Sequence, residues 1–311
     1  MAIELDPFIA EALAARASAV LPERDDPIRL REFLNPGFQP SHAQAGPAPD
    51  VSFSSFHAAS QDGTAIPLRL YKKAGSNPGS AVVYLHGGGL ICGSVELYDT
   101  LLRTYVQWTG VPFLAVDNRL APEVKGTTIT EDAFAGVEWL LEHAAEHLID
   151  PARIAVMGDS GGGTPAAGAA ILARDRGIDL KRQILIYPML DDRNTEPDPE
   201  LAPTAVWSYD NNYTGWHALL GDRIGTEEVS PLAAPARNRD FRGLAPAYIE
   251  VGDLDIFRDE QLDYAARLVR AGVSTELHMY PGAPHGYDWI GYGGPLTERW
   301  RADRVRVIQA L

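Results

Sequence analysis

Short runs of β-forming residues alternate with longer helical stretches from about residue 62 onward. The expected strands are Ile66–Tyr71, Ala81–Leu85, Pro112–Val116, Ile154–Met157, Gln183–Tyr187, Ala247–Val251 and Thr275–Tyr280. The expected helices between them include Leu97–Thr109, Glu131–Ala145, Thr164–Arg176 and Arg258–Ala271. Strand–helix–strand repetition at this spacing predicts an α/β fold with a mostly parallel central sheet flanked by helices. Runs that are apolar on both faces are typical of buried parallel strands.

Two segments break this alternation. Residues 1–45 carry a helical stretch, Pro7–Leu21, followed by a passage rich in proline and glycine. Residues 191–235 separate two strands by more than one helix requires, and they contain Trp207, Tyr209, Tyr213 and Trp216. A long excursion from a sheet is usually functional or disordered, and the aromatic residues argue against disorder. We therefore expect one domain, 1–311, with a cap formed by residues 1–45 and about 191–235.

The charge and composition exclude several classes of partner. A formal charge of −15 repels phosphate backbones and anionic lipid headgroups, so we expect no nucleic-acid and no membrane partner. No apolar run reaches the roughly 20 residues that span a bilayer. The single cysteine, Cys92, allows no intramolecular disulfide. Acidic residues near the N-terminus argue against a signal peptide, and we expect a cytoplasmic protein.

Ser160 lies at the centre of Gly158-Asp-Ser-Gly-Gly162, which matches G-x-S-x-G. The motif follows an expected strand and precedes an expected helix, as in a nucleophile elbow, where a tight turn holds the serine in a strained conformation. Chymotrypsin-like proteases have the same five residues, but on an all-β scaffold with His and Asp ahead of Ser. The α/β alternation opposes that interpretation. A glycine-rich turn with an incidental serine remains the alternative for the pentapeptide alone.

Three glycines follow the expected strand Ala81–Leu85, in the run His86-Gly-Gly-Gly89. Glycine lets backbone N–H groups approach a ligand without a side chain between them, and this run is typical of lipases and esterases. We expect the N–H groups of Gly88, Gly89 and Gly161 to form an oxyanion hole, and His86 to orient the loop. The alternative is a simple glycine turn.

The general base is expected on a loop after the last strand. His285 lies there, in a Pro/Gly-rich turn, whereas the other seven histidines precede or lie within that strand. The acid is less defined, because Asp253 and Asp255 both follow the strand Ala247–Val251, and spacing alone does not separate them. Asp191 and Asp192 follow an earlier strand, and Asp259 is expected in the helix that begins near Arg258.

From about residue 50 to its end the chain resembles bacterial esterases of the hormone-sensitive-lipase family, within the α/β-hydrolase fold. The resemblance rests on His86–Leu90, Asp117–Glu123, Arg153–Ser160, Leu185–Pro188, Asp255–Glu260 and His285-Gly286. The family's acid opens the D-x-x-x-D-E block, which implies Asp255, and its cap combines the N-terminal segment with an insertion after the sixth strand. The chain departs from the family at Gly161, where alanine is usual and where we expect a looser elbow, and at residues 126–129, which replace an F-P-A stretch.

Together these features predict a lipase-like serine carboxylesterase that acts through an acyl-enzyme, with Ser160, His285 and Asp255 as its triad. No metal and no organic cofactor are expected, the partner is a small-molecule ester, and a homodimer stays open. The cap aromatics suit a small pocket, which favours short- to medium-chain esters over emulsified triglycerides. They equally suit packing of the cap onto the sheet. A non-catalytic ligand receptor, an amidase and a lactonase are the rivals on the same fold.

Overall fold

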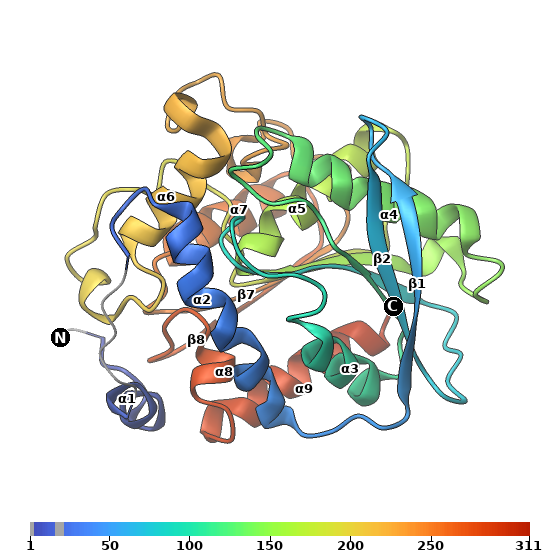
Figure 1. Cartoon of the computed structure of the whole chain (residues 1–311), viewed down its shortest axis with the longest axis horizontal. Helices are drawn as coiled ribbons and strands as arrows, with labels where there is room; N and C mark the ends of the chain where they lie inside the picture. Colours follow the sequence, from blue (N-terminus) through green and yellow to red (C-terminus); the bar gives the residue numbers. More distant parts are fainter. Residues whose placement is uncertain (1–2, 16–21) are drawn as a thin grey trace.

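One eight-stranded sheet organises the computed structural model, which describes residues 3–15 and 22–311 (Figure 1). Its spatial order is β1-β2-β4-β3-β5-β6-β7-β8. The strands are β1 (Val51–Ala59), β2 (Ala65–Lys73), β3 (Ala81–Leu85), β4 (Phe113–Val116), β5 (Ile154–Asp159), β6 (Arg182–Ile186), β7 (Ala247–Gly252) and β8 (Thr275–Tyr280). β1 and β2 pair in antiparallel fashion, as do β2 and β4, and all other neighbours are parallel. The predicted mostly parallel sheet is confirmed.

Helices cover both faces of the sheet. Side chains of α4, α5 and α7 share one hydrophobic cluster with the strands, and side chains of α3 and α9 share a second cluster on the opposite face. The helices are α1 (Pro7–Ala14), α2 (Pro27–His42), α3 (Asp99–Thr109), α4 (Thr128–His143), α5 (Gly163–Asp175), α6 (Tyr209–Leu220), α7 (Arg258–Arg270), α8 (Tyr287–Ile290) and α9 (Pro295–Gln309). The α/β-hydrolase architecture predicted from the sequence is therefore present.

The N-terminal segment differs from the expectation. The predicted helix Pro7–Leu21 is observed as α1 up to Ala14, and residues 16–21 lie outside the described residues. The passage expected to be irregular contains α2, a helix of 16 residues with Pro36 and Pro40 inside it. Asp26 caps α2 by accepting a hydrogen bond from the backbone of Arg29 at 3.0 Å. Packing of this helix against the rest of the molecule outweighs the loss of backbone hydrogen bonds at the two prolines.

A third hydrophobic cluster lies beyond the two that cover the sheet. It joins α2, α6 and the loop after β3, with Leu30, Leu90 and Trp216 among its members. Figure 1 shows α2 and α6 side by side, and the two helices are in contact. The two segments that interrupt the α/β alternation thus meet above the strand ends where the glycine-rich loops emerge.

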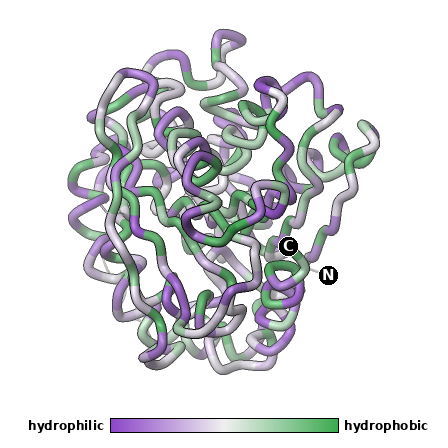
Figure 2. Tube along the Cα trace, turned by 90° about the vertical axis from the view of Figure 1, so that its right-hand side faces the viewer, coloured by the Kyte–Doolittle hydropathy of each residue, from purple (hydrophilic) through white to green (hydrophobic). Residues whose placement is uncertain are grey.

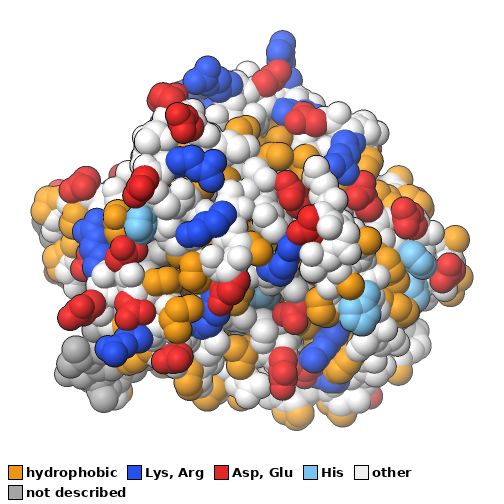
Figure 3. All heavy atoms as spheres, turned by 45° about the horizontal axis from the view of Figure 1, so that its top comes forward, with side chains coloured by type: hydrophobic (Ala, Val, Ile, Leu, Met, Phe, Trp, Pro, Cys, Tyr) orange, Lys and Arg blue, Asp and Glu red, His pale blue; other side chains and the backbone are white. Residues whose placement is uncertain are grey.

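The outer surface is polar and of mixed charge. In Figure 2 hydrophilic residues run along the outer loops and helices, while segments that turn inward are more hydrophobic. On the face shown in Figure 3, acidic and basic side chains are interspersed. Among the described residues, none of the helices has the length and apolar character needed to cross a membrane.

Candidate active site

Ser160 occupies a strained turn between β5 and α5. Its backbone φ is +52°, in the left-handed region that non-glycine residues rarely adopt. Two neighbouring glycines make the turn possible: a Cβ on Gly158 would collide with the carbonyl of Gly162, and a Cβ on Gly162 would collide with the carbonyl of Leu85. The local sequence therefore produces the sharp elbow that the G-x-S-x-G motif predicted.

A continuous chain of hydrogen bonds links three of the predicted site residues. The Ser160 Oγ lies 2.8 Å from the His285 Nε2, and the His285 Nδ1 lies 2.8 Å from the Asp255 Oδ2. Asp255 is fully buried, and its other carboxylate oxygen accepts a hydrogen bond from the Phe257 backbone at 2.9 Å. The imidazole is held between two aromatic rings that it meets edge to face. Its centroid lies 4.9 Å from the centroid of the Tyr187 ring and 5.1 Å from that of the Phe257 ring. These contacts fix both the position and the orientation of the base.

The structure separates Asp255 from the competing carboxylates. Asp253 accepts a hydrogen bond from the Gly282 backbone at 2.7 Å, so it supports the loop that carries His285 rather than the imidazole itself. Asp259 lies in the first turn of α7, as expected. Spacing alone left Asp253 and Asp255 open, because the turn after β7 is what decides which carboxylate points at the imidazole.

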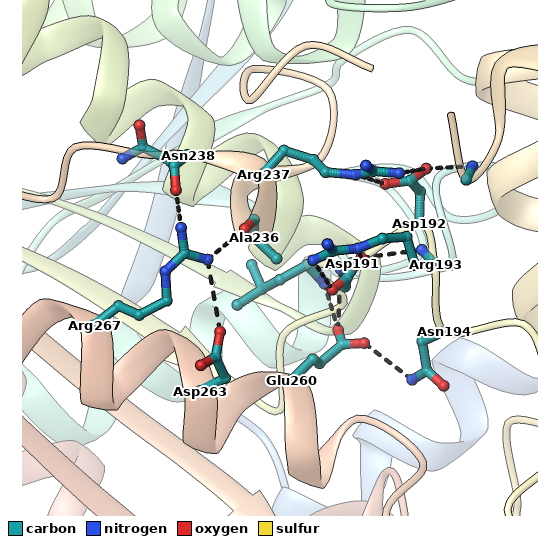
Figure 4. Close-up of polar contacts among 12 residues, drawn as sticks. Asp191, Asp192, Arg193, Asn194, Ala236, Arg237, Asn238, Glu260, Asp263 and Arg267 are labelled. Atoms are coloured by element: carbon teal, nitrogen blue, oxygen red, sulfur yellow. Dashed lines mark hydrogen bonds and ion pairs between the residues drawn. The ribbon is translucent and has the colours of Figure 1, made fainter. Parts of the chain in front are cut away.

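Asp191 and Asp192 belong to a different network, drawn in Figure 4. Asp191 pairs with Arg193 at 2.6 Å, and the buried Asp192 pairs with Arg237 at 2.7 Å. Glu260 on α7 accepts hydrogen bonds from the Asn194 side chain and from the backbone of residue 190 in the same network. This network ties the start of the long insertion, and residue 237 beyond its end, to the main body of the fold.

The loop after β3 presents unpaired backbone donors. Gly88 and Gly89 have φ values of +121° and +57°, and their N–H groups donate to no carbonyl of the described residues. The turn is closed from behind by the Cys92 N–H, which donates to the Gly88 carbonyl at 2.8 Å. His86 is buried, its Nδ1 lies 2.8 Å from the Gly87 carbonyl oxygen, and the centroid of its ring lies 5.6 Å from that of Tyr98.

Gly161 lies against this loop. A Cβ on Gly161 would come within 2.5 Å of the Gly89 nitrogen and 2.8 Å of the Leu90 nitrogen. The absence of a side chain therefore brings the elbow and the glycine loop together, and the loosening expected from glycine at this position is not what the packing shows. The three predicted donors, Gly88, Gly89 and Gly161, lie on backbone segments in direct contact.

Ser160 and His285 open into a cavity of about 210 Å³. Of the four cap aromatics considered for the pocket, Trp207 lines this cavity, and its ring covers Gly89. The other three lie elsewhere: Trp216 is fully buried in the third hydrophobic cluster, Tyr213 stacks on His217, and Tyr209 lines a separate surface pocket. Tyr209, Tyr213 and Trp216 are spaced at i, i+4 and i+7 on α6, so they share one face of the helix, and that face is turned away from the cavity.

Sequence reasoning missed two buried residues beside the nucleophile. The Asp159 carboxyl accepts a hydrogen bond from the Tyr84 hydroxyl, and burial raises its pKa to about 7. The Tyr187 hydroxyl donates to Asp288 at 2.9 Å, and Asp288 pairs with the buried Arg304 at 2.7 Å. Asp159 stood in the elbow motif and Tyr187 in the block 185–188, but nothing in the sequence showed that they are buried neighbours.

One group of potential metal ligands occurs among the described residues, away from the cavity lining. Glu276, His278 and Asp303 bring their ligand atoms within 4.8 Å of one another on β8 and α9. Both carboxylates also pair with Arg306. None of these residues lines the cavity that contains Ser160.

Comparison with known proteins places this site in a family. A family model described as an alpha/beta hydrolase fold matches residues 82–288. The chain is similar to an ethyl acetate hydrolase of Pseudomonas putida, with 32% identity over 83% of this chain and 81% of the relative. It is also similar to a carboxylesterase of Mycobacterium tuberculosis, with 36% identity over 72% of each chain.

Solved structures agree with these relatives. A bacterial heroin esterase superposes with a TM-score of 0.89 at 33% identity, covering 98% of this chain and 97% of the other. An esterase of the archaeon Pyrobaculum calidifontis gives a TM-score of 0.87 at 29% identity, covering 99% of both chains. The chain therefore belongs to the α/β-hydrolase family and is a carboxylic ester hydrolase of its hormone-sensitive-lipase branch.

Proposed function

We propose that this enzyme hydrolyses short- to medium-chain carboxylic esters, with Ser160, His285 and Asp255 as its catalytic triad. The observation that supports this most directly is the hydrogen-bonded series from the buried Asp255 through His285 to Ser160, at 2.8 Å for each step. Its last member opens into a cavity. A nucleophile, a base and an orienting acid in this order are what acyl transfer requires.

The proposed reaction has two halves. The His285 Nε2 accepts the Ser160 proton as the Oγ attacks the ester carbonyl, and Asp255 holds the imidazole in the tautomer that leaves the Nε2 free. The negative charge on the tetrahedral oxygen is stabilised by the N–H groups of Gly88, Gly89 and Gly161. The alcohol leaves with the proton from His285, and water then attacks the acyl-enzyme by the same steps in reverse.

We assign residues 1–45 and about 191–235 to a cap over this cavity. The shared hydrophobic cluster of α2, α6 and the glycine loop supports this assignment. The cavity of about 210 Å³, with Trp207 in its wall, has room for a short acyl or alcohol chain, whereas longer chains would have to displace the cap. The Pseudomonas putida relative is named for ethyl acetate, a small ester of the proposed kind.

The proposed location is the cytoplasm, and the single cysteine supports it. Cys92 is buried and unpaired, as is usual for proteins of a reducing compartment. Subcellular fractionation of the native host, with activity recovered in the cytosolic fraction, tests this part of the proposal. Recovery of the activity outside the cytosolic fraction would contradict it.

The function is tested with a matched ester and amide. We expect hydrolysis of 4-nitrophenyl butanoate and little or none of butanoic 4-nitroanilide, with kcat/KM for a nitrophenyl series highest at short to medium acyl chains. Faster cleavage of the anilide would indicate an amidase, and no cleavage of either would indicate a ligand receptor. A steady rise of kcat/KM through long chains, with activation at a lipid interface, would contradict the small capped pocket.

A further inference from the structure

Asn211 has a carboxamide with no hydrogen-bond partner among the described residues. It lies in the first turn of α6, is 5% exposed and lines the cavity that contains Ser160. Its backbone N–H is bonded to the Ser208 hydroxyl at 3.1 Å. Its side chain makes no hydrogen bond to a protein group within residues 3–15 and 22–311, and its amide atoms are not enclosed by protein, so they are open to the cavity. A carboxamide in this position can both donate and accept a hydrogen bond.

The face of α6 that carries Asn211 packs directly on the glycine loop. Gly215 lies one turn further along the same face, and a Cβ there would come within 2.5 Å of the Gly89 carbonyl oxygen. The ring of Trp207, four residues before Asn211, also covers Gly89. The close approach at Gly215 therefore fixes the distance between α6 and the loop, and it places Asn211 at the cavity wall next to the proposed oxyanion donors.

The imidazole of His42, the last residue of α2, forms another part of the cavity wall. The residue is 2% exposed, and its Nδ1, which has no hydrogen-bond partner among the described residues, is enclosed by protein. The centroid of its ring lies 4.7 Å from the centroid of the Tyr98 ring and 4.9 Å from that of the Trp289 ring. Burial lowers the pKa of His42 to about 4, so the ring is neutral at pH 7. His42 therefore adds no positive charge to the cavity wall.

The remaining lining limits the charge of a substrate. None of the described residues that line the cavity is a lysine or an arginine, and its one carboxyl group is Asp159. Most of the other side chains in the wall are aliphatic or aromatic. An anionic substrate would find no counter-ion there, and a cationic one would find a carboxyl whose pKa burial has raised to about 7. The cavity therefore suits an uncharged molecule with a small number of hydrogen-bonding atoms.

We propose that Asn211 is a specificity-determining residue that binds an uncharged oxygen-containing group of the substrate. The preferred substrates are then short esters that carry an ether, hydroxyl or carbonyl oxygen besides the ester, rather than esters of plain hydrocarbon chains. This inference rests on the proposed esterase function and names the substrate class for the same site. A purely hydrocarbon ester leaves the Asn211 carboxamide buried without a partner, which weakens binding.

Two pairs of esters of nearly equal size test the proposal. In the acyl pair, 4-nitrophenyl methoxyacetate is compared with 4-nitrophenyl butanoate. The enzymatic kcat/KM of each ester is divided by the rate constant for its hydrolysis by hydroxide without enzyme, which removes the difference in intrinsic reactivity between the two esters. In the alcohol pair, 2-methoxyethyl acetate is compared with butyl acetate. We expect the wild-type kcat/KM to favour the ether ester in at least one pair by about three- to tenfold, the size of one neutral hydrogen bond.

The variants separate recognition from folding. Asn211→Leu, which has the same number and branching of side-chain heavy atoms, should bring the ratio close to one. Asn211→Asp, of the same shape, should also lower it, because a carboxylate cannot donate to an ether oxygen. Asp210→Asn, on an exposed side chain of the same helix, should keep the wild-type ratio. Damage to the fold would lower kcat/KM for both esters of a pair together. The ratio of the two kcat/KM values therefore reports recognition of the substrate alone.

The outcomes are distinct. A wild-type ratio near one in both pairs, or the wild-type ratio retained in Asn211→Leu and Asn211→Asp, overturns the role of Asn211 and leaves the esterase function standing. If the wild type hydrolyses none of the four esters, the proposed function itself fails and this inference fails with it.

Discussion

The backbone nitrogen of Gly89 lies in the space that a side chain on Gly161 would occupy, at 2.5 Å from an ideal Cβ. The elbow and the glycine loop are therefore in contact through bare backbone. The family resemblance implied alanine at this position, and the chain has Gly161 instead.

Gly161→Ala should consequently push the Gly89 segment away from the oxyanion. We expect kcat to fall by at least roughly tenfold, and by at most the about 10²- to 10³-fold that follows the loss of a whole oxyanion donor, while KM changes little. Steady-state kinetics on a short nitrophenyl ester measure this effect. Wild-type kcat in Gly161→Ala would mean that the loop relaxes without consequence, and the close contact would then have no role in catalysis.

The assignment of the acid is tested by two parallel substitutions. Asp255→Asn should lower kcat by about 10⁴-fold, because the amide stabilises the wrong imidazole tautomer. Asp253→Asn should have a much smaller effect, because its partner is the Gly282 backbone and an amide oxygen can still accept that hydrogen bond. Larger damage from the change at 253 than from the change at 255 would show that the acid is misassigned.

Trp207 should set the length of the acyl or alcohol chain that the cavity accepts. Trp207→Ala removes the ring that covers Gly89, so we expect the optimum of kcat/KM to move to longer chains. Tyr213→Ala is the matched control, because Tyr213 lies on the same insertion but stacks on His217 outside the cavity. The account of the pocket fails if both variants keep the wild-type chain-length profile, or if only the Tyr213 variant changes it.

Asp159 should make the stability of the protein depend on pH. Its folded pKa of about 7 lies above the value of about 3.9 for an unfolded aspartate, so between these values the folded protein holds a proton that the unfolded chain has lost. The stabilisation from this group is therefore complete below about pH 4 and is lost as the pH rises through about 7, by at most about 1.4 kcal/mol for each unit.

Asp159→Asn cannot ionise, so it should lack this part of the pH dependence. Urea unfolding of both proteins between pH 4.5 and 8 gives the comparison. We expect the unfolding free energy of the wild type to decline relative to that of Asp159→Asn as the pH rises to about 7, and to stay parallel above it. Parallel curves over the whole range would show that Asp159 is ionised in the folded protein throughout.

Local patterns were sufficient to predict the buried part of the fold. Strands such as β3 and β5 are apolar on both faces, and the helices between them are long enough to be recognised by their pattern. The edge strand β1 was missed because most of its side chains are exposed and polar residues interrupt its pattern. The helix α2 was missed because Pro36 and Pro40 are local signals against a helix, and tertiary packing overrides them.

The residues of the site likewise fall into those that local sequence could predict and those that depend on the three-dimensional fold. Ser160 and the glycine loop lie in short motifs whose geometry is local, and His285 follows from its place after the last strand. The choice of Asp255 needed the family resemblance. Asn211 and Tyr187 could not be assigned from the sequence, because their importance comes from which neighbours they lack or contact in three dimensions.

The central claim is that Ser160 is the nucleophile of an ester hydrolase. The most direct measurement is the steady-state hydrolysis of 4-nitrophenyl butanoate by the wild type and by Ser160→Ala, with circular dichroism and urea unfolding showing that both are folded. The account predicts that the variant keeps the fold and loses several orders of magnitude in kcat, about 10⁶-fold if the triad acts as a unit. A folded Ser160→Ala protein that hydrolyses the ester at the wild-type rate would contradict it.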